Sequence, residues 1–198
     1  LKQLEHAENE KVDLVKLMIT GGVLDAKEKG VPGELKMKPE MVKAVCDRAH
    51  AAGYKVAAHV ESPDGVKVAL ANGVDSIEHG AKPDDEMIRL FKEKNAFLCT
   101  TISPAVPYAL FDRSLTNATE VEQYNGNIVF DGIVECAKAA LANDIPVVLG
   151  NDVGCPWITQ YDFWRELCYF HKYTGVSNAF ALYTATKRSA ELAGIGDI

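Results

Sequence analysis

The sequence has no apolar run near the roughly 18 to 20 residues that a membrane-spanning helix requires. Its first residues, LKQLEHAENE, are polar and charged, unlike a signal peptide. The five cysteines are scattered without CxxC spacing, which excludes a zinc ribbon or a dithiol redox motif and fits a reducing compartment. We therefore expect a cytoplasmic protein with no membrane partner.

Basic character is also missing. The formal net charge is -7 and the isoelectric point is near 5.3, so the chain lacks the positive surface that binds phosphates, and we expect no nucleic-acid partner. A small-molecule or peptide substrate fits better, and a homo-oligomer stays open. The 198 residues suit one domain or part of one. Because no start methionine is present, we expect this sequence to be part of a longer protein.

Short apolar runs alternate with longer amphipathic segments along the chain. This alternation predicts parallel strands joined by helical crossovers, an α/β fold. Long loops are expected at about 103–125 and 150–160, where barrel enzymes place substrate contacts. The expected strands are 12–20, 54–60, 74–80, 96–102 and 145–152, and the expected helices are 39–53, 62–73, 84–91, 128–143, 161–173 and 177–192.

Four ionisable residues stand at the ends of predicted strands: Lys16, His59, His79 and Asp152. In a barrel the carboxyl ends of the strands converge on one mouth, so these side chains are expected to meet. Strict alternation along the third strand places Ile77 on the same inner face as His79. The specific signal is the order of the four residues along the chain: lysine, histidine, histidine, aspartate.

Imidazole nitrogens and a carboxylate are common ligands of zinc and similar divalent ions, which activate water for hydrolysis. An inward ammonium at Lys16 would repel such an ion. Carboxylation of Lys16 by carbon dioxide removes this conflict by turning the side chain into an anion. Taken singly, each residue also has an ordinary structural role, a packed histidine in a strand or an aspartate capping a turn.

Several segments resemble one known family. AAHVESPDGVKVALANGVDSIEHG is similar to strands five and six of the imidazolonepropionase-like branch of amidohydrolases, which includes Xaa-Pro dipeptidases and related carboxypeptidases. VKLMITGGV resembles strand four of that family, and LGNDVG resembles strand eight, where a threonine more often precedes the aspartate. The likeness runs from about residue 12 to residue 198.

The resemblance implies a (β/α)8 TIM barrel of which residues 1–198 hold only about strands four to eight, the C-terminal part. The β-sandwich domain of the family and its first strands, with their His-x-His pair, are expected to be absent. The implied activity is hydrolysis of amide or peptide C–N bonds by a metal-bound hydroxide, as in a dipeptidase or carboxypeptidase.

The resemblance also implies roles for single residues. Lys16 would be carboxylated and bridge two ions, His59 and His79 would bind the second, and Asp152 would bind the first and move a proton from the nucleophile to the leaving amine. One or two divalent ions are implied, with zinc as the first choice.

The expected long loops offer candidates for substrate binding. Tyr108 and Arg113 lie in the loop after strand seven, and an arginine there could pair with a substrate carboxylate. Trp157, in the loop after strand eight, could wall an apolar pocket.

Two other functions remain open at this point. Lys16 could form a Schiff base, as in a barrel lyase or aldolase. The chain could also be a non-catalytic barrel fragment used for binding or assembly.

Overall fold

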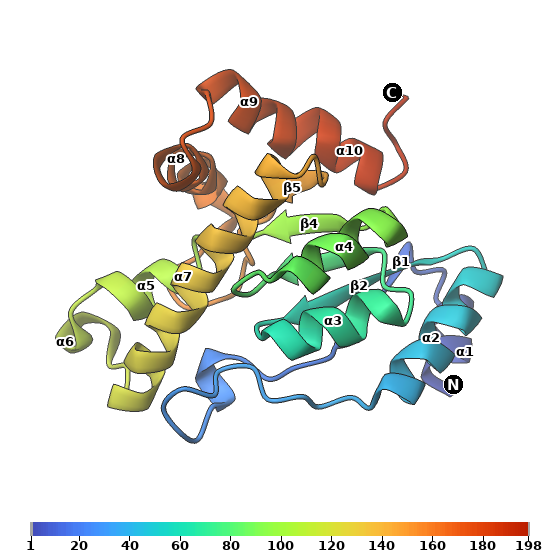
Figure 1. Cartoon of the computed structure of the whole chain (residues 1–198), viewed down its shortest axis with the longest axis horizontal. Coiled ribbons are helices and arrows are strands. Elements are labelled where there is room, and N and C mark those ends of the chain that lie inside the picture. The colour runs from blue at the N-terminus through green and yellow to red at the C-terminus, as the bar shows by residue number, and fades with distance from the viewer. Residues whose placement is uncertain (1, 198) are drawn as a thin grey trace.

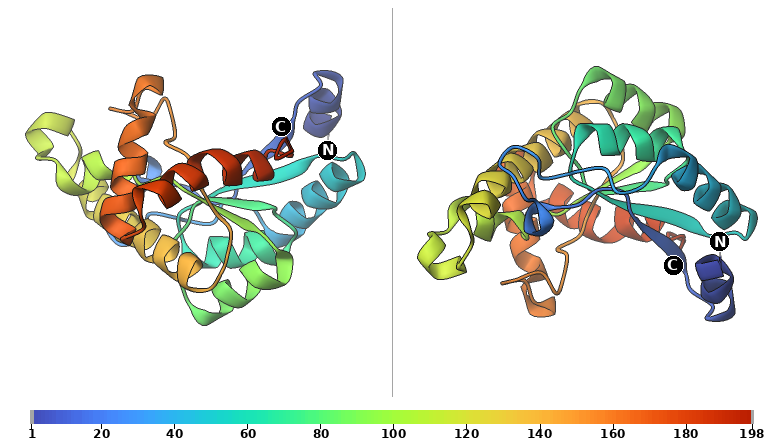
Figure 2. Two further views of the ribbon diagram at one scale, coloured as in Figure 1. Left: turned by 90° about the horizontal axis from the view of Figure 1, so that it is seen from above. Right: turned by 90° about the horizontal axis from the view of Figure 1, so that it is seen from below.

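The computed structural model describes residues 2–197, and its framework is one sheet of five parallel strands in chain order, β1 to β5. Each strand is joined to the next by a helical connection, and the sheet curves with the helices α2, α3 and α4 side by side along one face (Figures 1 and 2). The predicted α/β fold with parallel strands is confirmed.

All five strands lie within the predicted ranges. They are β1 Leu14–Met18, β2 Lys55–Val60, β3 Ser76–His79, β4 Phe97–Thr100 and β5 Val147–Leu149. The helices are α1 Lys2–Asn9, α2 Pro39–Ala51, α3 Pro63–Ala71, α4 Asp85–Lys94, α5 Ala105–Leu110, α6 Arg113–Thr116, α7 Glu120–Ala142, α8 Phe163–Thr174, α9 Asn178–Tyr183 and α10 Ser189–Leu192. Two short 3-10 turns, η1 Val23–Asp25 and η2 Gln160–Asp162, and a π-helical segment, η3 Thr184–Arg188, complete the helical elements. Across residues 2–197, every helix is too short or too polar to pass through a bilayer.

The expected loop at 103–125 is wrong in its extent, because it contains α5, α6 and the first turns of α7. The long helix α7 begins at Glu120 rather than at residue 128. Its start is fixed by a capping box, in which the Thr119 hydroxyl accepts from the Glu122 N–H and the Glu122 carboxylate accepts from the Thr119 N–H. Local capping therefore extends the helix beyond the apolar stripe that predicts it.

The two faces of the sheet differ in character. Val15, Val56 and Leu98 are buried in the core on the face that the helices cover. On the other face, Lys16 pairs with Ala57 and Met18 pairs with His59. Met18 is 56% exposed, so this inner face is open beside β1. The inner face is the one that carries the candidate ligands.

A buried carboxylate joins α8 to the turn after β4. Glu166 is fully buried and accepts hydrogen bonds from the N–H groups of Ile102 and Ser103, both at 2.7 Å, and from the Ser103 hydroxyl. Burial raises the pKa of Glu166 to about 7, although these three hydrogen bonds favour the ionised form. Glu166 therefore fixes the path of the chain where β4 opens onto the inner face.

Replacing Glu166 with alanine should leave two buried N–H groups without an acceptor. Each such group costs about 1–3 kcal/mol, so we expect the free energy of unfolding to fall by roughly 2–6 kcal/mol. Glu166→Gln keeps one oxygen acceptor and nearly the same volume, so its loss should be smaller. Urea unfolding curves measure both effects, and an unchanged midpoint for Glu166→Ala would contradict this role.

The raised pKa of Glu166 also predicts a pH dependence of stability. The folded protein binds the proton of the Glu166 carboxyl more tightly than the unfolded chain does. The contribution of this proton to the free energy of unfolding is therefore fully present below pH 4.5 and is lost as the pH rises to about 7. Relative to Glu166→Gln, which does not titrate, the wild-type free energy of unfolding should fall by roughly 3 kcal/mol across that window. A difference that stays constant in urea titrations from pH 4.5 to 7.5 would refute this prediction.

Candidate metal centre

The structure brings the four predicted ligands to one cleft of about 390 Å³. Lys16 comes from the middle of β1 rather than from its predicted C-terminal end. His59 comes from β2, His79 from β3, and Asp152 from the segment that follows β5. The rest of the wall is largely apolar and includes Met18, Val23, Leu24, Pro104, Ala105, Tyr108, Val129 and Ile133. An apolar cleft with a few convergent polar groups is the usual form of a small-molecule site.

The two histidines lie edge to face, with ring centroids 4.6 Å apart. His59 Nε2 is 3.3 Å from the Gly21 carbonyl oxygen, and His79 Nδ1 is 2.6 Å from the Thr101 hydroxyl. The second nitrogen of each ring has no hydrogen bond within residues 2–197. Metal-binding histidines commonly use one nitrogen for the ion and the other for such a supporting bond.

Both imidazoles are held in the neutral form that binds metals. Burial lowers the pKa of His59, with a smaller contribution from the Lys16 charge, while the Gly21 carbonyl and Asp152 act in the opposite direction. Burial lowers the pKa of His79 well below its usual value, and His59 and Lys16 lower it further. Neither ring therefore carries a charge that would repel a cation at neutral pH.

The prediction that Ile77 shares the inner face with His79 is wrong. Ile77 pairs with Ala58, and both are fully buried on the helix-covered face. His79 pairs with Val60, so simple alternation would turn its ring toward the helices as well. The backbone of His79 is left-handed, with φ of 70°, and this departure from strand geometry returns the ring to His59.

Asp152 has the same unusual backbone, with φ of 50°. Non-glycine residues in this region cost about 1–3 kcal/mol each and gather at functional sites. The Asp152 carbonyl oxygen accepts from the Cys155 N–H at 3.1 Å, which closes the turn, and the side chain stays exposed at the mouth of the cleft. Backbone strain at two of the four candidate ligands thus supports a functional site here, and this strain cannot be recognised from the residue types alone.

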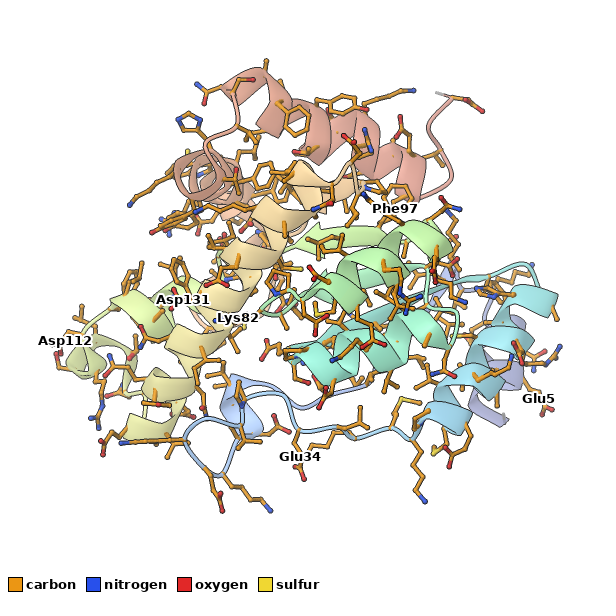
Figure 3. All side chains as sticks on the ribbon, viewed as in Figure 1. Glu5, Glu34, Lys82, Phe97, Asp112 and Asp131 are labelled. Atoms are coloured by element: carbon orange, nitrogen blue, oxygen red, sulfur yellow. The ribbon has the colours of Figure 1, made fainter. Side chains whose placement is uncertain are left out.

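The loop after β1 forms one wall of the cleft through its residues 22–25. Figure 3 labels Glu34 on the returning arm of this loop. The two arms of the loop are joined where the Gly21 N–H donates to the Glu34 carbonyl at 2.8 Å. Asn125, buried in α7, holds the tip: its Oδ1 accepts from the Gly30 N–H and its Nδ2 donates to the Glu28 carbonyl. The loop that accepts the His59 hydrogen bond is thus anchored to a neighbouring helix.

Glu61 is a site residue that the sequence reasoning missed. It lines the same cleft, and one carboxylate oxygen lies with a nitrogen of His59 and one of His79 in a group within 4.8 Å of one another. Burial raises the pKa of Glu61 to about 8, against one hydrogen bond from the Val23 N–H at 3.1 Å. The sequence did contain a signal for Glu61: it stands two residues after His59, and alternate residues of a strand point to the same face even just past the strand end.

The candidate substrate residues do not all reach the cleft. Tyr108 lines it and is 8% exposed. Arg113 instead donates from Nε to the Ala118 carbonyl at 3.1 Å. Trp157 is 55% exposed and lines a separate small cavity with Phe111. Of the three, only Tyr108 is placed beside the four candidate ligands.

Comparisons with known proteins identify the family of the chain. The chain matches the Amidohydrolase family over residues 2–198. The crystal structure of a candidate prolidase from Bifidobacterium longum is 36% identical, with a TM-score of 0.87 over 96% of this chain and 47% of that one. A Xaa-Pro dipeptidase with methionine bound in its active site is 26% identical, with a TM-score of 0.79 over 96% of this chain and 46% of the other.

An uncharacterized protein of Mycobacterium tuberculosis is 40% identical over 63 residues, which cover 32% of this chain and 17% of that protein. The chain spans about half the length of the solved structures it matches. Its five parallel strands correspond to part of the TIM barrel of those relatives. From the family match along nearly its whole length and the shared fold, we conclude that this chain belongs to the amidohydrolase family.

Proposed function

We propose that this chain supplies part of the barrel of a metal-dependent hydrolase that cleaves C–N bonds in amides or peptides, acting as a dipeptidase or carboxypeptidase. The observation that carries the proposal is the convergence of Lys16, His59, His79 and Asp152 on one cleft. The relatives described as a prolidase and a Xaa-Pro dipeptidase support a short peptide as the substrate.

The donor set of the cleft fits a divalent ion. Two neutral imidazoles with free nitrogens and a carboxylate at the mouth are the ligands that zinc prefers, and zinc is our first choice. His59 and His79 would hold one ion, and Asp152 would bind a second. A divalent ion bound there would polarise the scissile carbonyl and make a neighbouring water more acidic.

Lys16 supports the site only if its charge changes. As an ammonium group it disfavours positive charge on both histidines, and it would disfavour a cation there for the same reason. Attack of the neutral amine on carbon dioxide forms an N–C bond and releases a proton, which leaves a carbamate anion. The carbamate would stand in the same cleft as the two imidazoles and would supply anionic oxygens as a bridging ligand for two ions.

Asp152 is suited to proton transfer. Its carboxylate stands exposed at the mouth of the cleft, where a substrate would enter. In the proposed reaction it takes a proton from the attacking water and delivers it to the nitrogen of the leaving amine. Tyr108 and the apolar wall beside it would contact the substrate side chain and exclude water.

Asp152→Asn tests the proton-transfer role. The amide keeps an oxygen that can bind a metal but cannot act as a base, so we expect hydrolysis of Xaa-Pro dipeptides to fall at least about 100-fold while part of the bound metal is kept. Turnover and metal content are measured on the same samples. Asp144→Asn, an exposed change before β5, serves as the control. Near-normal turnover by Asp152→Asn would exclude the assigned role.

Lys16→Met tests the carbamate. Metal-free wild-type protein should take up divalent ions faster and more tightly with bicarbonate than without it, and ¹³C-bicarbonate should give a carbamate signal in NMR spectra. Lys16→Met should lose both responses. Lys55→Met should keep them, because Lys55 is the first residue of β2 and lies at the end of that strand away from His59. Covalent trapping of substrate on Lys16 by borohydride would instead indicate Schiff-base chemistry.

A further inference from the structure

The short stretch from β2 to β3 carries three metal-binding groups in one place. His59 is the last residue but one of β2, Glu61 directly follows that strand, and His79 ends β3. A ligand atom from each of the three lies within 4.8 Å of the other two. Ligand atoms of a tetrahedral zinc ion are about 3.3–3.4 Å apart at its usual bond lengths, so side-chain movements of roughly 1 Å would let one ion touch all three.

Within residues 2–197, no basic side chain forms an ion pair with the Glu61 carboxylate. Its one hydrogen bond within residues 2–197 comes from the Val23 N–H to Oε2. The charges that act on it are those of Asp25 and Asp152, and both are negative. A partly buried carboxylate among other carboxylates is costly unless it is neutralised or binds a cation.

The surrounding backbone leaves room at the carboxylate and holds it in place. A Cβ atom on Gly22 would lie 2.9 Å from Glu61 Oε2 and 3.5 Å from His59 Cε1, so a side chain there would fill the space beside both groups. A Cβ atom on Gly33 would lie 2.6 Å from the Glu61 carbonyl oxygen. The loop after β1 thus passes close on both sides of Glu61 because glycines stand at these positions.

The histidines are already arranged for this ligand set. Gly21 and Thr101 occupy one nitrogen of each ring, and the other nitrogen of each is without a hydrogen bond in the described chain. Two histidines and one glutamate form a known catalytic zinc set that keeps a fourth position open. The cleft supplies this set without any contribution from Asp152 or Lys16.

We propose that Glu61 is a third protein ligand beside His59 and His79, so that residues 59–79 alone hold one divalent cation. This inference rests on the proposed function, because it concerns the same cleft. If carboxylation of Lys16 is prevented, His59, Glu61 and His79 would still bind one ion. One ion per chain should therefore survive in Lys16→Met.

The test is a titration of metal-free protein with Zn²⁺ and Co²⁺, with bound metal counted after dialysis and the visible spectrum of Co²⁺ recorded. Glu61→Gln keeps an oxygen for the Val23 N–H but loses the charge, and we expect at least about 100-fold weaker binding of one ion and an altered Co²⁺ spectrum. Asp144→Asn, a loss of one carboxylate charge outside the cleft, should change affinity less than about 3-fold. Glu61→His should restore binding, since three imidazoles are also a zinc set.

The outcomes separate this inference from the function on which it rests. If wild-type protein binds no divalent ion, the proposed function itself fails. If His59→Asn weakens binding while Glu61→Gln matches wild type, the function stands and the Glu61 assignment is overturned. If Glu61→Gln leaves binding intact but raises KM for substrates with a free amino group and not for N-acylated ones, Glu61 recognises the substrate ammonium and is not a ligand.

Discussion

The parallel pairing of β2 with β3 is the constraint on which the site depends. It places His59 beside Glu78 and Val60 beside His79, so the two histidines are offset by one position along neighbouring strands. A slip of one residue would move a whole strand face from the inner side to the helix side. The helix α3, which connects β2 to β3, has little freedom to shift, because Gly65 in α3 packs so closely that a Cβ atom there would lie 2.3 Å from the Thr20 side chain.

The sequence was sufficient to predict the strands, their order and their parallel sense. Apolar runs of the right length identify buried strands, and long amphipathic segments between them permit only crossovers. The order of Lys16, His59, His79 and Asp152 then predicted where the polar groups would meet. These features depend on composition and spacing along the chain, which a single sequence contains.

Other features depend on backbone conformations and contacts between distant segments, which the sequence does not state. Strict alternation misplaced Ile77 because it assumed extended geometry up to His79, whose φ of 70° breaks it. Glu61 was overlooked because the count stopped at the strand end. Arg113 was chosen for its charge, but its guanidinium is bonded to the backbone of its own segment.

Stability and ligand orientation are linked through the turn after β4. Glu166 holds the N–H groups of Ile102 and Ser103, and the residue before them, Thr101, meets His79 through its hydroxyl. A change in α8 that releases this turn would free the ring of His79 as well as weaken the fold. The buried carboxylate in a peripheral helix therefore acts on the centre through two intermediate residues.

The charges in the cleft link metal binding to the carboxylation of Lys16. Asp25 and Asp152 bring negative charge to the cleft, Glu61 adds to it when ionised, and carboxylation would reverse the positive charge of Lys16, the basic residue among those that line the cleft. Four anions at such close range repel one another, so the carbamate is unfavourable without a cation. A cation held by His59, Glu61 and His79 would stabilise it, and by reciprocity the carbamate would tighten the hold on that cation. In the proposed site, the first ion bound would thus stabilise the carbamate that a second ion requires.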